Sequence, residues 1–219
     1  MREGGPLRPA AIVFDWDNTL VDTWPVIHES LSVTFQAMGH EPWTFEETRQ
    51  RVRKSLRDAF PGLFGDRWEE ARQIFYAAFE RTHLQRLQPI EDAGELLAFL
   101  SSAGIHLAVL SNKTGAYLRA EATHLGWSGY FGSLVGAGDA ARDKPARESL
   151  RLALAHAPVR PGPRVWIVGD AGIDMEIAHK TGCLPVLLHR DGGDPEFVTW
   201  PPAHCFASCR GLLQYMTGW

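Results

Sequence analysis

The stretch Phe14-Asp15-Trp16-Asp17-Asn18-Thr19-Leu20-Val21-Asp22 follows directly on the apolar run Ala11-Ile12-Val13. An uninterrupted apolar run of this kind is typical of a strand buried on both faces, as in a parallel sheet. Asp15 and Asp17 come at its carboxyl end, and ligands bind at that edge of an open α/β sheet. Asp, Asn and Thr also close ordinary turns, so the rest of the chain decides between a turn and a site.

Further apolar runs alternate with amphipathic segments after residue 89. We predict strands over residues 105–110, 133–136, 164–168 and 184–188, with a short edge strand at 205–206 before the last helix. Helices are predicted over 93–103, 116–125 and 146–155, and in a segment that ends near Ala178. Strands that alternate with helices predict an α/β fold, a doubly wound parallel sheet covered on both faces.

Residues 22–88 interrupt this alternation with a helical pattern. Pro25 suits the first turn of a helix that ends at Gly39, and a second helix begins at a capping box of Thr44 and Glu47. A third helix is predicted over 67–87. We therefore expect one domain from residues 1–21 and 89–219, with a helical insertion at 22–88. The insertion carries a basic cluster, which is either a solvated helix face or a set of cations for an anionic substrate: Arg49, Arg51, Arg53, Lys54 and Arg57.

Length and composition limit the classes of function. With 219 residues, 45% of them hydrophobic, the chain can form a large core domain with a smaller inserted one. A net charge of -4 argues against nucleic acid or an anionic membrane surface as a partner, and no apolar run is long enough to span a bilayer. Three cysteines are too few for a disulfide framework, so we expect a cytoplasmic protein. Nothing in the sequence indicates an oligomeric state.

Polar side chains follow three of the predicted strands, and a lysine precedes one of the helices. In a parallel sheet, all of these side chains reach the same edge. Carboxylates gathered without a cation repel one another, and hard oxygen ligands suit Mg²⁺. We therefore predict a magnesium site at this edge, held by Asp15, Asp17 and Asp170. The other side chains gathered there are those of Ser111, Asn112, Lys144 and Asp174, and Gly169 precedes Asp170.

Phosphoryl transfer is the chemistry that such a set supports. Asp15 is predicted to attack phosphorus and form an aspartyl-phosphate. Asp17 is predicted to protonate the leaving alcohol and then to activate water for the second step.

The remaining residues have supporting roles in this scheme. Ser111 and Lys144 would hold the phosphate oxygens and offset their negative charge. Asp170 would bind Mg²⁺, and Asp174 would orient either the metal shell or Lys144.

The chain resembles the haloacid-dehalogenase-like hydrolases, especially their phosphoglycolate-phosphatase-like branch. The first motif of that family, Asp-x-Asp-x-Thr, is matched by residues 15–19, and the second, an apolar strand ending in Ser or Thr, by Ser111 with Asn112. Lys144 matches the third motif, and Gly169, Asp170 and Asp174 match the fourth, Gly-Asp-x-x-x-Asp. Order and spacing agree over residues 11–190.

This resemblance implies a Rossmann-like core with an α-helical cap inserted after the first strand, where the helical insertion lies. It implies Mg²⁺ bound by Asp15, Asp170 and the backbone carbonyl of Asp17, with Thr19 and Asn112 helping to position phosphate and backbone. The implied substrate is a small phosphorylated metabolite, with 2-phosphoglycolate as the first candidate. Asn18 stands where glycine is commoner in the family, and asparagine tolerates unusual backbone angles.

Three alternatives stay open at this point. A sugar phosphomutase uses the same core and returns the phosphoryl group to a sugar. A non-catalytic member of the fold could bind proteins through its eight tryptophans, although every motif position is intact. Phosphonate-cleaving relatives use a cap lysine, a role that Lys54 could fill here. Those relatives and the founding dehalogenases lack the second aspartate of the first motif, whereas this chain has Asp17 at that position.

Overall fold

The computed structural model describes residues 8–52, 56–188 and 195–218, and it divides the chain into two compact units. Met1–Val21 and Pro89–Trp219 form the first unit, and Asp22–Gln88 forms the second. The chain passes between the units at two short strands, β2 (Val21–Asp22) and β3 (Gln88–Pro89), which form a two-stranded sheet. Strands of two residues are too short to produce a hydrophobic period, so the sequence pattern does not reveal them.

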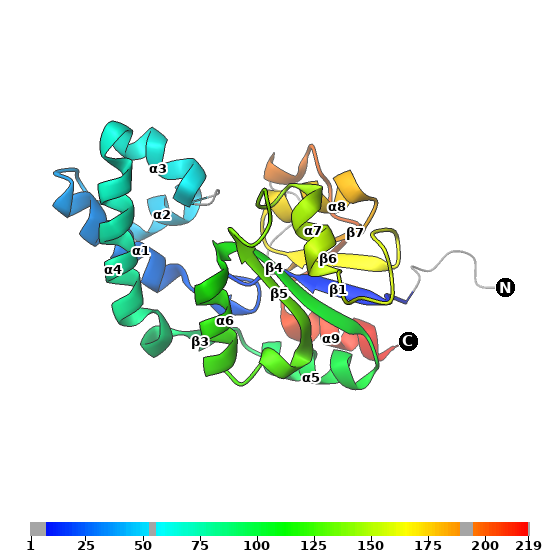
Figure 1. The fold of residues 1–219 in the computed structure, drawn as a ribbon. Coiled ribbons are helices and arrows are strands. Elements are labelled where there is room, and N and C mark those ends of the chain that lie inside the picture. The colour runs from blue at the N-terminus through cyan, green and yellow to red at the C-terminus, as the bar shows by residue number, and fades with distance from the viewer. Residues whose placement is uncertain (1–7, 53–55, 189–194, 219) are drawn as a thin grey trace. The chain divides into compact units, whose positions relative to one another are not determined.

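A six-stranded sheet forms the centre of the first unit, in the order β5-β4-β1-β6-β7-β8 (Figure 1). Every neighbouring pair is parallel, which confirms the predicted parallel sheet. The apolar runs of the sequence supply its strands, which are β1 (Ala11–Phe14), β4 (His106–Thr114), β5 (Phe131–Ala137), β6 (Val165–Gly169), β7 (Leu184–Leu188) and β8 (His204–Phe206).

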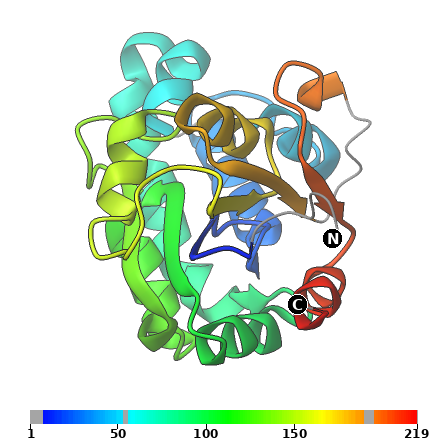
Figure 2. The same ribbon diagram turned by 90° about the vertical axis from the view of Figure 1, so that its right-hand side faces the viewer.

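Helices cover both faces of this sheet, so the Rossmann-like α/β fold is confirmed. Helices α7 and α8 pack against each other on one face, and α5, α6 and α9 lie over the other face (Figures 1 and 2). Their bounds are α5 (Ala93–Ser102), α6 (Gly115–His124), α7 (Arg147–Ala153), α8 (Gly172–Thr181) and α9 (Cys209–Thr217), with short 3-10 turns η2 (Ser128–Tyr130) and η3 (Pro195–Phe197).

The alternation of side chains along β1 decides what each following residue faces. All four residues of β1 are fully buried. Ala11 and Val13 pack with Leu150 of α7 and Ile177 of α8. Because neighbouring side chains in a strand point to opposite faces, Asp15 continues the row that faces α7 and α8. Trp16 continues the other row, toward α6.

Strand β4 is longer than the sequence pattern predicts. The apolar run ends at Leu110, but the strand continues to Thr114, so Ser111 and Asn112 lie inside it rather than after it. Pairing with β5 shifts register between Leu110 and Thr114, where four positions of β4 pass over two of β5. An irregularity of this kind redirects side chains, and hydrophobic periodicity cannot reveal it because the residues involved are polar.

The second unit consists of helices α1 (Trp24–Ala37), α2 (Phe45–Arg51), α3 (Leu56–Phe64) and α4 (Trp68–Arg86), with a 3-10 turn η1 (Gly65–Arg67). Helices α1 and α4 pack against each other, around buried aromatic side chains that include Phe35, Phe64 and Phe75. Helix α3 is absent from the helices predicted from the sequence. Pro61 lies inside it, and proline normally breaks a helix. Among the described helices of the whole chain, none is long and apolar enough to cross a membrane.

The basic cluster of the second unit is described only in part. Arg49 and Arg51 are exposed on α2, where Arg51 pairs with Glu47 at 2.9 Å. Arg53, Lys54 and the side chain of Arg57 lie outside the described residues.

The predicted capping box at the start of α2 is confirmed. Thr44 Oγ1 accepts a hydrogen bond from the Glu47 backbone N–H at 3.2 Å, and the Thr44 N–H donates to Glu47 Oε2 at 2.9 Å. This reciprocal pair satisfies two of the N–H groups that a helix start leaves without an intrahelical partner.

We expect Thr44→Ala to lower the free energy of unfolding of the second unit by about 1 kcal/mol, because alanine offers no oxygen to the Glu47 N–H. Urea denaturation followed by circular dichroism measures the change. Thr44→Ser is the matched control, since serine keeps the hydroxyl and caps as well as threonine. An equal loss in both variants would show that the threonine methyl group, and not the cap, stabilises this segment.

Candidate active site

The carboxyl ends of β1 and β6 bring the first two aspartates together. Asp15 directly follows β1, and its backbone N–H donates to the Val168 carbonyl oxygen of β6 at 2.8 Å. Asp170 directly follows β6, and the buried Thr19 hydroxyl donates to its Oδ1 at 3.3 Å. Thr19 therefore connects the loop after β1 to the loop after β6.

A buried lysine bridges two of the predicted carboxylates. Lys144 Nζ donates to Asp15 Oδ1 and to Asp174 Oδ1, each at 2.7 Å. The three side chains are at most 10% exposed. Asn112 Nδ2 donates to the Lys144 backbone oxygen at 3.4 Å, so β4 also supports the lysine. The predicted association of Lys144 with Asp174 is thus present in the structure.

Steric crowding explains the glycine of the Gly-Asp-x-x-x-Asp motif, Gly169. A Cβ atom at Gly169 would lie 2.2 Å from the Asp174 Cγ atom, so a larger residue there would displace the carboxylate. Asp174 lies in the first turn of α8, and its Oδ2 accepts from the Ala171 N–H at 3.2 Å. Both Asp174 oxygens are therefore held by donors of the protein.

Asp15, Asp170 and Asp174 form a group that could hold a metal ion, because one oxygen from each lies within 4.8 Å of the others. Burial, opposed by Lys144 and reinforced by Asp174 and Asp17, raises the pKa of Asp15 to about 6. The three carboxylates of this group also outnumber the one lysine that contacts them among the described residues. A set of hard oxygen donors with excess negative charge fits a divalent cation such as Mg²⁺.

Lys144 experiences two opposed electrostatic effects. Burial alone would lower its pKa, but the carboxylates of Asp15 and Asp174 outweigh burial and raise the pKa above its usual value. Lys144 is therefore a permanent cation beside the predicted nucleophile.

The loop after Asp15 is tightly folded. Asn18 has a φ of 59°, in the left-handed region, and its N–H donates to the Val21 carbonyl oxygen at 2.7 Å. Asparagine tolerates this conformation better than most residues other than glycine. This is the backbone angle that the motif's usual glycine would supply.

Ser111 and Asp17 complete the predicted set. Ser111 is 2% exposed and lies in β4, the strand next to β1, where its Oγ accepts from the Lys113 N–H at 3.2 Å. The Asp17 carboxylate contacts Lys113, with 2.7 Å between Lys113 Nζ and Asp17 Oδ1. The carboxylates of Asp15 and Asp17 are therefore each paired with a different lysine.

The sequence motifs assign no role to Lys113 or to its second partner, Glu121. Lys113 Nζ donates to both Glu121 oxygens, at 2.8 and 2.7 Å. Burial would lower the pKa of Lys113, but Asp17 and Glu121 outweigh burial and raise it. One signal was available, because Glu121 lies on the buried stripe of its helix with Leu118 and Ala122, where an unpaired charge would be costly.

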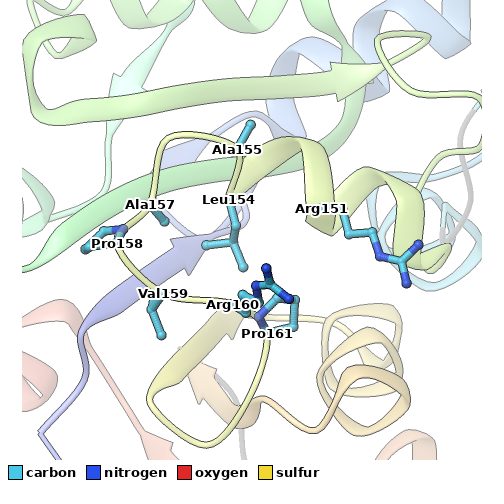
Figure 3. A pocket seen from close by; sticks show the side chains of 8 residues that line it. All are labelled: Arg151, Leu154, Ala155, Ala157, Pro158, Val159, Arg160 and Pro161. Carbon is cyan, nitrogen blue, oxygen red and sulfur yellow. The ribbon is translucent and has the colours of Figure 1, made fainter.

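A pocket of about 590 Å³ lies elsewhere in the first unit. Figure 3 shows its lining side chains, which come from the end of α7 and from the loop that leads to β6, among them Arg151, Leu154 and Arg160. That loop precedes β6 and so lies toward the amino ends of the strands, whereas the aspartates follow the carboxyl ends. None of the predicted site residues lines this pocket.

The fold and the site define an α/β enzyme whose carboxylates and lysines meet at the carboxyl edge of a parallel sheet. Residues 12–187 match the model of the family described as haloacid dehalogenase-like hydrolase. The chain belongs to this family, which confirms the resemblance stated from the motifs and the assignment of the protein as a hydrolase.

Individual relatives agree with this assignment. The chain is 29% identical over 195 residues to a phosphoglycolate phosphatase of Neisseria meningitidis, an alignment that covers 84% of this chain and 82% of the relative. It is 28% identical over 181 residues to an N-acetylmuramic acid 6-phosphate phosphatase of Pseudomonas aeruginosa, with 80% of each chain covered. A haloacid dehalogenase-like family hydrolase of Streptococcus pneumoniae has the same fold, with a TM-score of 0.83, 24% identity, and 94% and 98% of the two chains covered.

Proposed function

We propose that this protein is a Mg²⁺-dependent phosphatase that hydrolyses a small phosphomonoester through an aspartyl-phosphate, with 2-phosphoglycolate as the first candidate substrate. The observation that carries the proposal is the position of Lys144, which bridges Asp15 and Asp174 at 2.7 Å beside the group of three aspartates. This arrangement pairs a carboxylate nucleophile with a fixed cation at the place where phosphate charge would develop. The names of the relatives support a phosphatase.

In the first chemical step, an Asp15 oxygen bonds to phosphorus while the bond from phosphorus to the substrate oxygen breaks. Asp17, in its protonated form, gives its proton to that leaving oxygen, so an alcohol departs. Lys144 and Ser111 bind the phosphoryl oxygens, and Lys144 offsets their charge. The products of this step are the alcohol and an aspartyl-phosphate at Asp15.

In the second step, the Asp17 carboxylate takes a proton from water as the water oxygen bonds to phosphorus. The bond between phosphorus and Asp15 breaks, which releases inorganic phosphate and restores the Asp15 carboxylate. Asp17 holds the proton that the next cycle needs. Thr19 and Asp174 act on neighbouring groups, Thr19 by orienting Asp170 and Asp174 by orienting Lys144.

We assign Asp15, Asp170 and the backbone carbonyl of Asp17 as the residues that would hold Mg²⁺. When bound, the ion supplies charge stabilisation to the transferring phosphoryl group and reduces the repulsion between phosphate and carboxylates. Asp174 lies close enough to belong to the same group, but both of its oxygens are held by Lys144 and Ala171. It is therefore assigned to positioning.

We further propose that Asp22–Gln88 is the cap domain that selects the substrate, with Arg49 and Arg51 among the cations available to an anionic group. Cap domains of this kind exclude water and complete the site around a bound substrate. All three cysteines are free, as expected in the reducing cytoplasm, the compartment that we propose.

We expect phosphate release from a panel of small phosphomonoesters to depend on Mg²⁺ and to stop in the presence of EDTA. The panel comprises 2-phosphoglycolate, N-acetylmuramic acid 6-phosphate and glucose 1-phosphate. Since excess negative charge gathers at the site, Mg²⁺ alone should also raise the melting temperature of the wild type, and Asp170→Asn should weaken that rise.

The outcomes separate the remaining alternatives. A phosphomutase would turn glucose 1-phosphate into its isomer and release little phosphate. A protein that binds Mg²⁺ but releases phosphate from no compound would support the non-catalytic alternative. Release that persists in EDTA, with no effect of Mg²⁺ on the melting temperature, would contradict the proposed metal dependence.

A further inference from the structure

Each aspartate of the Asp15-Trp16-Asp17 motif has its own buried lysine, which bridges it to a second carboxylate. Lys144 joins Asp15 to Asp174, and Lys113 joins Asp17 to Glu121. The first bridge belongs to the motifs from which the family was inferred. The second does not, and the proposed mechanism gives it no role.

The Lys113 bridge runs from the protein core to the accessible edge of the site. Glu121 is fully buried, the Lys113 side chain is 5% exposed, and the Asp17 side chain is 21% exposed. A lysine buried to this degree is stable only when its charge is paired and hydrogen-bonded. Glu121 supplies that partner through both oxygens, so the ammonium group is held independently of Asp17.

The inner end of the bridge is itself fixed. Trp16 Nε1 donates to Glu121 Oε2 at 2.7 Å, and the indole is fully buried. Its ring lies edge-on to Trp127, with centroids 6.0 Å apart, and to Phe131, at 6.4 Å. The large residue between the two aspartates thus has a specific use, because it binds the carboxylate that holds the lysine.

The backbone at Lys113 is constrained as well. Lys113 lies where the pairing of β4 and β5 shifts register, and a Cβ atom at Gly136 of β5 would lie 2.5 Å from the Lys113 carbonyl oxygen. Only glycine allows this close approach of the two strands. The side chain of Lys113 therefore starts from a defined backbone position and ends at a defined anchor.

We propose that Lys113, anchored by Glu121 and Trp16, is a positioning residue that holds the Asp17 carboxylate in place for its transfers of a proton to and from the substrate oxygen and water. This inference rests on the proposed function, since Asp17 is the proposed acid and base. It differs from the role of Lys144, because Lys113 acts through Asp17 and not on the phosphate.

The test is a double-mutant cycle with Lys113→Met and Asp17→Asn, measured on the best substrate of the panel. If Lys113 acts through Asp17, Lys113→Met lowers kcat on the order of 10- to 100-fold and changes KM little. In the Asp17→Asn background, the same substitution causes no further loss, because the group it positions has been removed. A further loss in that background, equal to the loss in the wild type, would overturn the proposal.

A substrate whose leaving group needs no proton provides an independent test of whether Lys113 acts through Asp17. The p-nitrophenolate ion leaves without a proton from the enzyme, so Lys113→Met should keep the rapid first release of p-nitrophenolate from p-nitrophenyl phosphate and slow the turnovers that follow. A general structural defect would lower the first release and the later turnovers equally. Lys113→Arg, which keeps the cation, should recover part of the lost kcat.

Removing the ammonium leaves Glu121 buried without its cation, so Lys113→Met could unfold the protein. Lys113→Met/Glu121→Gln avoids this, since glutamine is neutral and still offers an oxygen to Trp16, and it should show the same loss of kcat. If the wild type hydrolyses nothing in the panel, the proposed function fails and this inference fails with it. If the wild type is active and the double variant equals it, only the role of Lys113 is refuted.

Discussion

Asp15→Asn is expected to abolish steady-state phosphate release, with kcat lowered by at least about 10³-fold. The amide is nearly isosteric with the carboxylate and can still accept the hydrogen bond from Lys144 Nζ, so the geometry around it is kept. It is not a nucleophile toward phosphorus, so no aspartyl-phosphate forms. Phosphate release at saturating substrate measures the loss of turnover. A test for acid-stable phosphorylated enzyme shows whether the aspartyl-phosphate forms.

The fold of this variant should be intact. Burial and the neighbouring carboxylates raise the pKa of Asp15 to about 6, which means that the folded site disfavours this negative charge, and removing it does not weaken the core. The melting temperature without Mg²⁺ should therefore equal or exceed that of the wild type. Asp66→Asn is the matched control, because Asp66 is exposed in η1 and its variant should keep the wild-type rate. Sustained turnover by Asp15→Asn in a folded protein would refute Asp15 as the nucleophile.

Much of this fold could be predicted because its strands are buried on both faces. Val186 in β7 and Ile167 in β6 belong to apolar runs with no polar interruption, and such runs indicate the buried strands of a parallel sheet. Two features could not be predicted in this way. Helix α3 contains Pro61, which local propensity excludes from a helix interior. The extension of β4 to Thr114 is polar, so its pairing with β5 leaves no hydrophobic signal.

The residues of the candidate site also fall into two groups, those that the sequence alone can place and those that it cannot. The sequence is enough to place Asp15, Asp170 and Lys144 together, because each lies next to the end of a parallel strand or the start of a helix, and the topology brings these points to one edge. The contact between Lys113 and Glu121 depends on the irregularity in β4 and on which face α6 presents. Neither can be derived from residue spacing, so this pair required the structure.

Lys144→Ala is expected to affect stability and activity together. It removes the cation from two carboxylates that are at most 10% exposed, and breaking a buried ion pair from one side costs about 3–5 kcal/mol. Phosphate release should fall on the order of 10²- to 10³-fold, the loss that follows removal of one group stabilising transition-state charge. Urea denaturation and the phosphate assay measure the two effects on the same preparation.

The two losses have different causes, so a second substitution should separate them. Lys144→Ala/Asp174→Asn removes one of the two carboxylates that the lysine leaves facing each other, and it should recover part of the lost free energy of unfolding. It should recover none of the activity, because no cation returns to the phosphoryl oxygens. If the double variant regained both stability and turnover, repulsion between Asp15 and Asp174 would explain the whole effect of Lys144→Ala. Lys144 would then serve to fold the site, and another cation would have to stabilise the transferring phosphoryl group.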